Sequence, residues 1–430
     1  MAAPIARRFD MTPRVFLKKK EESELKQGFP WVFDNEIESV RFEASDGSGV
    51  KTVPLADSML DAGVPDGSVV EVFANAGGFL GTGVLNRKSK ISVRIIGTEH
   101  ADKILADKAA FYERRIRDAH ELRKFRYSPD DSYRLVYGES DFIPGLIVER
   151  YVDIKKNVYL VVQFSTLSCE VFRREILSAL RKVVHPYGIF EKSDAPTREK
   201  EGLPLRSAWD GEVREGKIVI RENGVLIEVD MINGQKTGYF LDQKDNRRYV
   251  ASLCGGKRVL DTFTHTGAFG LNAVKGGAKE VVSVDLSADA VSLVERNIEL
   301  NGAQGKMKAV CADVFALLKE YEEKDEKFDV IILDPPAFTK SAKNIQKAYG
   351  GYKEINLRAM RLLTENGILV TCSCSYFFDA PHFYGMLMKA AEDAKRRVQI
   401  IAKFGAGADH PVLAGYPKSE YLKCAVCRVV

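Results

Sequence analysis

From about residue 230 to its end, the chain alternates short apolar runs with segments of helical pattern, and this alternation constrains the fold more than any other feature. Apolar strands that alternate with helices pair in parallel through right-handed crossovers. The region 230–430 therefore predicts a Rossmann-like, doubly wound α/β sheet, whose ligand site lies at the carboxyl ends of the strands. The expected strands lie at 258–260, 281–284, 307–310, 330–333 and 368–370.

Acidic residues mark that edge of the predicted sheet. Asp261, Asp285 and Asp334 end three of the strands, and Asp313 lies just past a fourth. Four carboxylates at one edge indicate a binding site. The first turn, 261–270, lacks the G-x-G-x-x-G spacing that brings a pyrophosphate to a helix N-terminus, which weighs against NAD. A cofactor with a ribose and a cationic centre suits the edge better, and Asp285 is placed to accept the ribose hydroxyls.

The rest of the chain predicts two smaller domains. Short alternating strands broken by turn residues favour a small β-barrel or sandwich within residues 1–98. A charge-rich helical segment, 99–130, links it to residues 131–229, where mixed strands and a helix predict an α+β domain. The first twenty residues form a basic edge that suits a phosphate backbone, although a solvated terminus is the commoner meaning of such a run. Its basic residues are Arg7, Arg8, Arg14, Lys18, Lys19 and Lys20.

Composition excludes several classes of protein. Of 430 residues, 45% are hydrophobic and 29% are charged, which is the balance of a folded multidomain protein and not of a disordered one. We find no apolar run of membrane-spanning length and no secretory leader, and seven cysteines without framework spacing fit reduced thiols. We therefore expect a cytoplasmic protein with no membrane partner. The net charge of +4 does not by itself indicate a nucleic-acid partner.

Several motifs become specific in combination: G-F-P-W-V-F at 28–33, the segment 133–150, G-Q-K-T-G-Y-F-L-D-Q at 234–243, D-x-F-x-x-x-G at 261–267, D-P-P-A-F at 334–338 and T-C-S-C-S at 371–375. With them, the chain resembles class I S-adenosylmethionine-dependent methyltransferases and, over nearly its whole length, the ribosomal RNA large subunit methyltransferase I family, which methylates carbon 5 of a cytosine in large-subunit ribosomal RNA. The resemblance implies an N-terminal PUA domain that binds RNA, followed by a central α+β domain. Phe29 departs from the family, in which histidine is expected.

The same resemblance implies S-adenosyl-L-methionine as methyl donor, ribosomal RNA as partner and no metal; a homodimer is left open. Phe338 offers a stacking face for the base, or is a core phenylalanine; the segment 235–247 walls the pocket, or is a hairpin with a solvated face. The residues expected to contact the cofactor are Asp261, Phe263, Thr266, Gly267, Asp285, Leu286, Asp313, Asp334, Pro335 and Gln243. Those expected to contact the substrate are Pro336, Phe338, Lys236 and Arg247.

The two cysteines of the T-C-S-C-S motif carry the expected mechanism. Carbon 5 of cytosine is a weak nucleophile, so a thiolate must first add to carbon 6. Comparison with the family places that nucleophile at Cys374 and leaves Cys372 as its neighbour, but alternate strand residues share a side, so spacing does not separate the two. A buried cysteine acting as a small hydrophobe is the alternative. Asp334 is expected to hydrogen-bond the cytosine edge and support its protonation.

Two other functions stay open at this point. An RNA N-methyltransferase on the same fold would use the 334–336 segment to polarise an amine or a guanine nitrogen, without a thiol. A non-catalytic RNA-binding ribosome assembly factor would keep the sheet as a scaffold. His265 has no metal-spaced partner, and the single C-x-x-C of Cys424 and Cys427 is expected to be a packed strand and not a zinc site.

Overall fold

The structure, a computed structural model, describes residues 11–44, 48–339 and 341–430, so the basic residues Arg7 and Arg8 lie outside the described residues. The chain folds as two compact units. The first unit comprises the chain up to Gly216 and two later segments, and the second unit comprises the remainder. The later segments of the first unit are Met231–Thr237 and Asp409–Ser419.

This division differs from the boundary expected at 229–230. The hairpin of β13 (Lys217–Glu222) and β14 (Val225–Asp230) belongs to the second unit. The backbone N–H groups of Leu226 and Glu228 donate to the side chains of Asn301, at 2.9 Å, and Asn297, at 2.8 Å. These asparagines lie on α8 (Ala288–Leu300) and at its C-cap. The contacts that place β14 are made by asparagine side chains about seventy residues later in the chain. No local pattern in the sequence therefore shows where this strand packs.

The N-terminal part of the first unit is a seven-stranded sheet of order β2-β7-β6-β5-β1-β3-β4. Its core is made by apolar residues that alternate along the strands, such as Val15 and Leu17, which are fully buried. The short helices α1 (Glu22–Lys26), η1 (Asp34–Glu36) and η2 (Leu55–Ala62) connect the strands. The strands are β1 (Arg14–Leu17), β2 (Trp31–Phe33), β3 (Ile37–Glu43), β4 (Val50–Val53), β5 (Val69–Phe73), β6 (Phe79–Leu85) and β7 (Ile91–Gly97).

The central part of the first unit is a five-stranded sheet of order β12-β11-β10-β9-β8, with a helical layer on one face. The predicted linking helix is instead two helices, α2 (Ala101–Ala106) and α3 (Lys108–Lys124), because Asp107 ends the first and caps the second by accepting a hydrogen bond from Ala110. Phe111 and Ile116 of α3 are buried in the core of this sheet. The remaining elements are β8 (Tyr133–Tyr137), η3 (Gly138–Asp141), β9 (Leu146–Val152), β10 (Val158–Phe164), α4 (Leu167–Glu170), α5 (Arg173–Val184), β11 (Gly188–Ser193), η4 (Pro196–Glu201) and β12 (Arg206–Trp209).

The returning segment Asp409–Ser419, which ends in η7 (Pro417–Ser419), is held by aromatic residues of the G-F-P-W-V-F motif. The ammonium of Lys418 lies 5.6 Å from the ring centre of Phe29, 4.7 Å from that of Trp31 and 5.6 Å from that of Phe33. A cation over aromatic faces is attracted by their quadrupoles. Phe29 thus supplies one of the three rings around this lysine.

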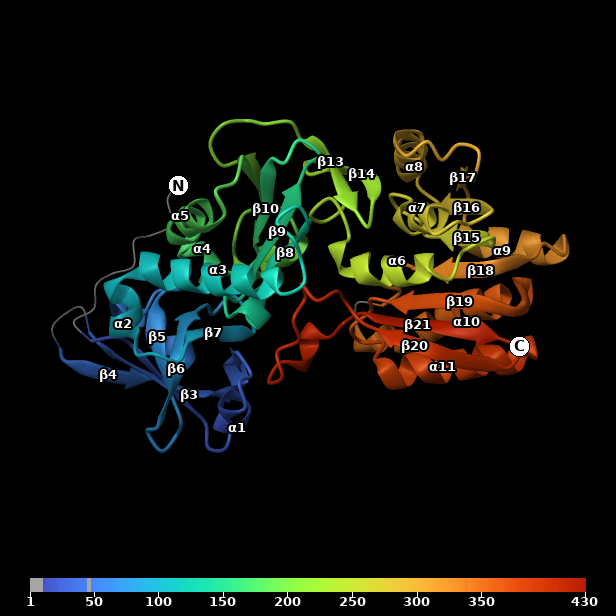
Figure 1. Ribbon diagram of the computed structural model, residues 1–430. Helices are drawn as coiled ribbons and strands as arrows, with labels where there is room; N and C mark the ends of the chain where they lie inside the picture. The colour runs from blue at the N-terminus through green and yellow to red at the C-terminus, as the bar shows by residue number, and fades with distance from the viewer. Residues whose placement is uncertain (1–10, 45–47, 340) are drawn as a thin grey trace. The chain divides into compact units, whose positions relative to one another are not determined.

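The second unit contains the predicted doubly wound sheet, and the structure confirms its parallel strands (Figure 1). The order is β17-β16-β15-β18-β19-β21-β20, in which β21 pairs antiparallel with both neighbours. The strands are β15 (Arg258–Thr262), β16 (Glu280–Asp285), β17 (Met307–Cys311), β18 (Phe328–Leu333), β19 (Leu363–Ser373), β20 (Val398–Phe404) and β21 (Lys423–Val429). The other helices are η5 (Leu241–Gln243), α6 (Lys244–Ala251), α7 (Ala268–Lys275), α9 (Val314–Glu323), η6 (Ala342–Asn344), α10 (Ile345–Leu362) and α11 (Ala380–Ala394).

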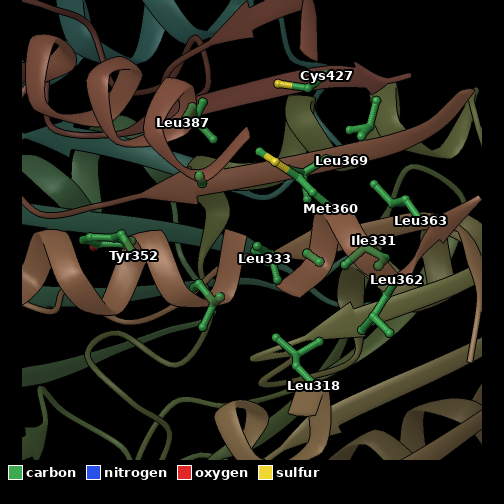
Figure 2. Close-up of a cluster of buried hydrophobic side chains, with 14 of the residues drawn as sticks. Leu318, Ile331, Leu333, Tyr352, Met360, Leu362, Leu363, Leu369, Leu387 and Cys427 are labelled. Carbon is green, nitrogen blue, oxygen red and sulfur yellow. The ribbon is translucent and has the colours of Figure 1, made fainter. Parts of the chain in front are cut away.

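Helices α9, α10 and α11 bury one face of this sheet. Leu318, Met360 and Leu387 from the three helices pack with Leu333 of β18 and Leu369 of β19 (Figure 2). Each of these five side chains is at most 3% exposed. Burying a leucine or methionine stabilises the fold by about 1.5 to 3 kcal/mol. This rigid layer fixes the strand ends that carry the acidic and cysteine motifs.

Candidate active site

The carboxyl ends of four parallel strands meet at one edge of the second unit's sheet. Thr262 of β15 pairs with Val284 of β16 and Leu333 of β18, and Leu333 pairs with Thr371 of β19. The residues that follow these positions therefore lie along the same edge. The structure thus brings together three of the predicted groups, Asp285, Asp334 and the T-C-S-C-S turn.

Asp261 lies inside β15, and its side chain is fully buried. Its Oδ2 accepts hydrogen bonds from Gly270 N, at 2.9 Å, from Ser283 Oγ, at 3.1 Å, and from Thr264 Oγ1. Burial raises the pKa of Asp261 to about 6, against these three donors. Its Oδ1 is buried with no hydrogen-bond partner among the described residues. Asp261 therefore holds the first turn and keeps one acceptor unsatisfied, as expected of a carboxylate that faces a polar ligand.

The first turn after β15 adopts the left-handed backbone conformation at three positions. Phe263 and His265 have φ values of 57° and 53°, and Gly267 has a φ of 78°. A Cβ at Gly270 would lie 2.4 Å from Ser283 Oγ. The buried Thr266 is held by Asn297, whose Nδ2 donates to Thr266 O at 2.9 Å. The turn is therefore tightly fixed without a G-x-G-x-x-G pattern.

Asp285 and Asp313 differ in how their carboxylates are used. The half-buried Asp285 accepts from His265 N at 2.9 Å and from Ser287 N at 3.0 Å. Next to it, Leu286 is 68% exposed, which leaves an apolar side chain beside a carboxylate. The exposed Asp313 caps α9 by accepting from Ala316 N at 2.9 Å. Asp285 and Leu286 suit a ribose and an apolar ring face, whereas Asp313 serves the helix in this structure.

Asp334 is the most strongly perturbed carboxyl group at the edge. Gln243 Nε2 donates to its Oδ1 at 3.0 Å, and Asn246 Nδ2 holds Gln243 Oε1 at 2.6 Å. Burial and the nearby negative charge of Asp242 raise the pKa of Asp334 to about 7, against the positive charge of Arg247. A carboxyl group that is partly protonated at neutral pH can donate as well as accept a hydrogen bond.

Arg247 does not stand free for the substrate contact that the sequence suggested. Its side chain is 3% exposed, and it donates to both carboxylate oxygens of Glu222, at 2.6 and 3.0 Å, and to Phe240 O at 2.7 Å. Although burial opposes it, the charge of Glu222 raises the pKa of Arg247 above its ordinary value. The guanidinium stays paired with Glu222, because moving away would leave the Glu222 carboxylate buried without a partner charge. Through its hydrogen bond to Phe240 O, it also fixes the chain before η5.

Replacing Arg247 with Met should lower the free energy of unfolding by about 3 to 5 kcal/mol, since it leaves the Glu222 charge buried and unpaired. Urea unfolding followed by circular dichroism measures this loss. The matched control is Arg248→Met, which removes an exposed partner of Asp245 and should change the same free energy by less than about 1 kcal/mol. A double change to Arg247→Met and Glu222→Leu should recover most of the stability. Equal losses for Arg247 and Arg248 would contradict the buried pair.

The segment 235–247 does not form a hairpin. It is a loop followed by η5 and the first residues of α6. Lys236 is exposed and has a φ of 51°, and it belongs to the first unit, whereas Gln243 and Arg247 belong to the second. Lys236 therefore lies in a different unit from Gln243 and Arg247, and its contact with the substrate stays a prediction.

The structure separates the two cysteines that spacing could not. Cys372 is fully buried on β19 opposite Cys424 of β21, and the hydrogen bond with Cys424, together with burial, raises its pKa well above the ordinary value. Cys374 follows the end of β19 and is half-buried, with its Sγ 4.0 Å from Pro335 O. The strand alternation ends at Ser373, so the two sulfur atoms have different surroundings. Cys427 is also buried on β21.

Phe338 packs against the core cluster of the second unit. Its ring centre lies 4.5 Å from that of Tyr352, 5.9 Å from Phe315 and 6.5 Å from Phe263. The ring is half-buried, whereas Pro336 is exposed and Pro335 is buried. This aromatic packing favours the core alternative for Phe338 and leaves Pro336 as the exposed residue of the D-P-P-A-F motif.

Sequence reasoning missed two residues of this edge, Lys423 and Tyr352. Lys423 Nζ donates to Ser375 O at 2.7 Å, and Tyr352 OH bonds to Ser375 Oγ at 2.9 Å. Neither residue lies in a recognisable motif: in the sequence, Tyr352 is one apolar position of a helical pattern and Lys423 is the start of a terminal strand. Only the pairing of β19 with β21 brings Lys423 to the site.

Taken together, the edge fits S-adenosylmethionine. Asp285 suits the ribose, Leu286 offers an apolar wall, and the unsatisfied Asp261 Oδ1 and the half-buried Asp334 supply negative character for a sulfonium group. A phosphate-bearing cofactor would meet the same carboxylates as like charges. The residues present therefore match a ligand with a positive centre and without phosphates.

Comparison with known proteins gives the family. A model of S-adenosylmethionine-dependent methyltransferases matches residues 206–400, and a PUA-like domain model matches residues 15–98. A "Ribosomal RNA large subunit methyltransferase I" from Aeromonas salmonicida is 40% identical over 422 residues, which cover 97% of this chain and 100% of that protein. The one from Aliivibrio fischeri is 37% identical over 424 residues, with 98% and 100% covered. The chain belongs to the ribosomal RNA large subunit methyltransferase I family.

This methyltransferase takes S-adenosylmethionine as its methyl donor. Among solved structures, a putative S-adenosylmethionine-dependent methyltransferase from Streptococcus mutans superposes with a TM-score of 0.77 at 23% identity, covering 97% of this chain and 100% of that one. A structure of a putative methyltransferase complexed with SAH gives the same values. These likenesses confirm the fold. Within the described ranges, the methyltransferase has no helix long and apolar enough to cross a bilayer.

Proposed function

We propose that this methyltransferase methylates carbon 5 of a cytosine in large-subunit ribosomal RNA through a covalent adduct on Cys374. The names of its relatives support ribosomal RNA as the class of substrate, and the PUA-like domain supports RNA as the partner. The observation that carries the reaction type is the position of Cys374. It lies at the acidic edge beside Pro335, whereas Cys372 is sealed between β19 and β21.

The proposed reaction requires two functions from the protein's own residues, a nucleophile and a proton donor. Cys374, as a thiolate, forms a bond from its sulfur to carbon 6 of the cytosine, which moves electron density onto carbon 5. S-adenosylmethionine supplies the electrophilic methyl group that carbon 5 then takes. Asp334, with a pKa raised to about 7, hydrogen-bonds the ring edge and supports its protonation while negative charge spreads into the ring. Loss of the carbon 5 proton and of the sulfur then frees the product.

The amino-terminal sheet supports a phosphate-binding role beside this chemistry. Of the basic edge, Lys18, Lys19 and Lys20 are exposed, although the ammonium of Lys18 also donates to Asn35 O at 2.7 Å. Arg14 is half-buried and lies 3.8 Å from Glu71. Among the described residues of this basic edge, the three exposed lysines are therefore the ones best placed to meet an RNA backbone.

Mass analysis of the methylated nucleoside tests the reaction type directly. The protein, labelled S-adenosylmethionine and either naked large-subunit ribosomal RNA or whole subunits should yield 5-methylcytosine. RNA carrying 5-fluorocytosine should stay attached to Cys374 under denaturing electrophoresis, because fluorine cannot leave as a proton does. A methyl group on an exocyclic amine or a guanine nitrogen would overturn the proposal in favour of the N-methyltransferase. Binding of RNA with no methyl transfer and no heat of S-adenosylmethionine binding would indicate an assembly factor.

A further inference from the structure

The turn that carries Cys374 is tied to the neighbouring strand by one lysine. Lys423 is the first residue of β21 and pairs with Ser373, directly before Cys374. Its half-buried ammonium donates to Ser375 O at 2.7 Å and to Tyr421 O at 2.9 Å. One side chain therefore joins the residue after the thiol to the chain that leads into β21.

A second contact holds the same turn from the opposite layer. The fully buried Tyr352 of α10 bonds through its hydroxyl to Ser375 Oγ, at 2.9 Å, and accepts from Ser373 Oγ at 3.1 Å. Tyr352 thus fixes Ser373, and Tyr352 and Lys423 together fix Ser375, so both neighbours of Cys374 are held. The thiol itself stays half-buried, so its turn is rigid while its sulfur is not sealed in the core.

Charge distinguishes Lys423 from a purely structural clamp. Burial lowers the pKa of Lys423 to about 8, while Cys374, Asp379 and Glu420 act in the opposite direction. Lysine with such a pKa is still mostly an ammonium at neutral pH. Asp379 is already engaged by His382, whose N donates to it at 3.0 Å, and Glu420 is exposed to solvent. Further titratable groups near the turn, among the described residues, include Tyr352 from α10 and Asp334, which directly precedes Pro335.

We propose that Lys423 is a positioning residue for Cys374, which fixes its turn through the Ser375 carbonyl and stabilises its thiolate as a neighbouring ammonium. This inference rests on the proposed adduct at Cys374. The thiol proton passes to solvent, the sulfur keeps the electron pair that forms the bond to carbon 6, and Lys423 keeps its own proton throughout. A thiolate stabilised before the RNA arrives raises the fraction of protein ready to react.

Alkylation of the free protein tests this without RNA or cofactor. In a Cys311→Ser background, which removes the exposed cysteine, the rate of Cys374 modification by iodoacetamide is followed by peptide mass spectrometry from pH 5 to pH 10. Lys423→Gln can still donate to the Ser375 carbonyl but has no charge, so the midpoint of Cys374 alkylation should rise by about 1 to 3 pH units. Lys423→Arg should keep the midpoint of the parent. Lys403→Met, an exposed change on β20, is the matched control and should also leave it in place.

An unchanged midpoint in a folded Lys423→Gln protein would overturn the proposal. Should that variant fail to fold, the Lys423→Arg protein provides the test. Arginine keeps a permanent positive charge, so the midpoint of Cys374 alkylation should equal that of the parent. A raised midpoint in Lys423→Arg would overturn the proposal. With ribosomal RNA, Lys423→Gln should lower kcat about tenfold or more at pH 7 and leave the KM for RNA within about twofold. The midpoint is read without any product, so a failure of the cytosine assignment and a failure of the lysine assignment give different results.

Discussion

Replacing Cys374 with Ala should reduce methyl transfer to large-subunit ribosomal RNA by at least about 10⁴-fold, which is the scale of losing a nucleophile that acts together with its site. The physical reason is that carbon 5 takes no methyl group until a sulfur has added to carbon 6. The second unit should keep its fold, because the thiol is only half-buried and its contact with Pro335 O is long, at 4.0 Å. Release of labelled methyl from the donor into RNA measures the rate.

Cys372→Ala provides the control for that loss. Its side chain is fully buried opposite Cys424, so removing it should lower the free energy of unfolding by about 1 kcal/mol and leave kcat within about threefold. The Cys374→Ala protein should also fail to form the denaturation-resistant complex with 5-fluorocytosine RNA. Full-rate 5-methylcytosine formation by Cys374→Ala, or a severe loss confined to Cys372→Ala, would show that the nucleophile is wrongly assigned.

Replacing Asp334 with Asn should slow methyl transfer by about 10² to 10⁴-fold, the usual range for loss of a group that exchanges a proton with the reacting ring. Because the pKa of Asp334 is raised to about 7, its protonated form fades above that pH, and the wild-type rate should fall on the alkaline side. The rising fraction of Cys374 thiolate acts in the other direction, so the profile is bell-shaped. The variant should lose the descending limb that belongs to Asp334. A descending limb that is unchanged in Asp334→Asn would remove it from this role.

The same substitution has a measurable effect on stability. An aspartate in the unfolded chain has a pKa near 3.9, so between about pH 4 and pH 7 the folded protein keeps a proton that the unfolded chain has lost. Stability present below pH 4 is therefore lost progressively as the pH rises to about 7. The Asp334→Asn protein escapes this loss, so it should be about 1 to 3 kcal/mol more stable than wild type at pH 8 and no different at pH 4. Urea unfolding at both pH values measures the difference.

Much of the fold could be predicted because the hydrophobic periodicity of the sequence, and the residues that begin and end its helices, agree with the final packing. The alternation after residue 230 predicts the five parallel strands, and α8 lies between Ser287 and Asn301, two residue types that favour helix ends. The hairpin 217–230 and the returning segment 409–419 were not predictable in this way. Their positions depend on tertiary contacts, such as those of Asn297 with β14 and of Lys418 with three aromatic rings, which leave no local pattern.

The candidate site was predictable to the extent that its chemistry is written in residue types. Carboxylates after apolar strands point to one edge, and the structure places Asp285 and Asp334 there. The two cysteines could not be separated, because the outcome depends on where β19 ends, one residue before Cys374. Arg247 looked like a substrate contact because its partner, Glu222, lies twenty-five residues earlier in a strand of ordinary pattern. The burial of one charge beside another depends on the packing of the whole molecule, and so does the hydrogen bond from Lys423 to the Ser375 carbonyl.

The path of the chain has a consequence for synthesis. Because Asp409–Ser419 returns to the first unit, that unit cannot be completed before residue 419 has left the ribosome. Until then the buried guanidinium of Arg123 has Asp141 but lacks the carbonyl of Asp409, which it meets at 2.8 Å in the finished protein. A chain that stops before Asp409 therefore lacks this contact in its N-terminal unit, so the folding of the PUA-bearing unit depends on synthesis of residues 409–419.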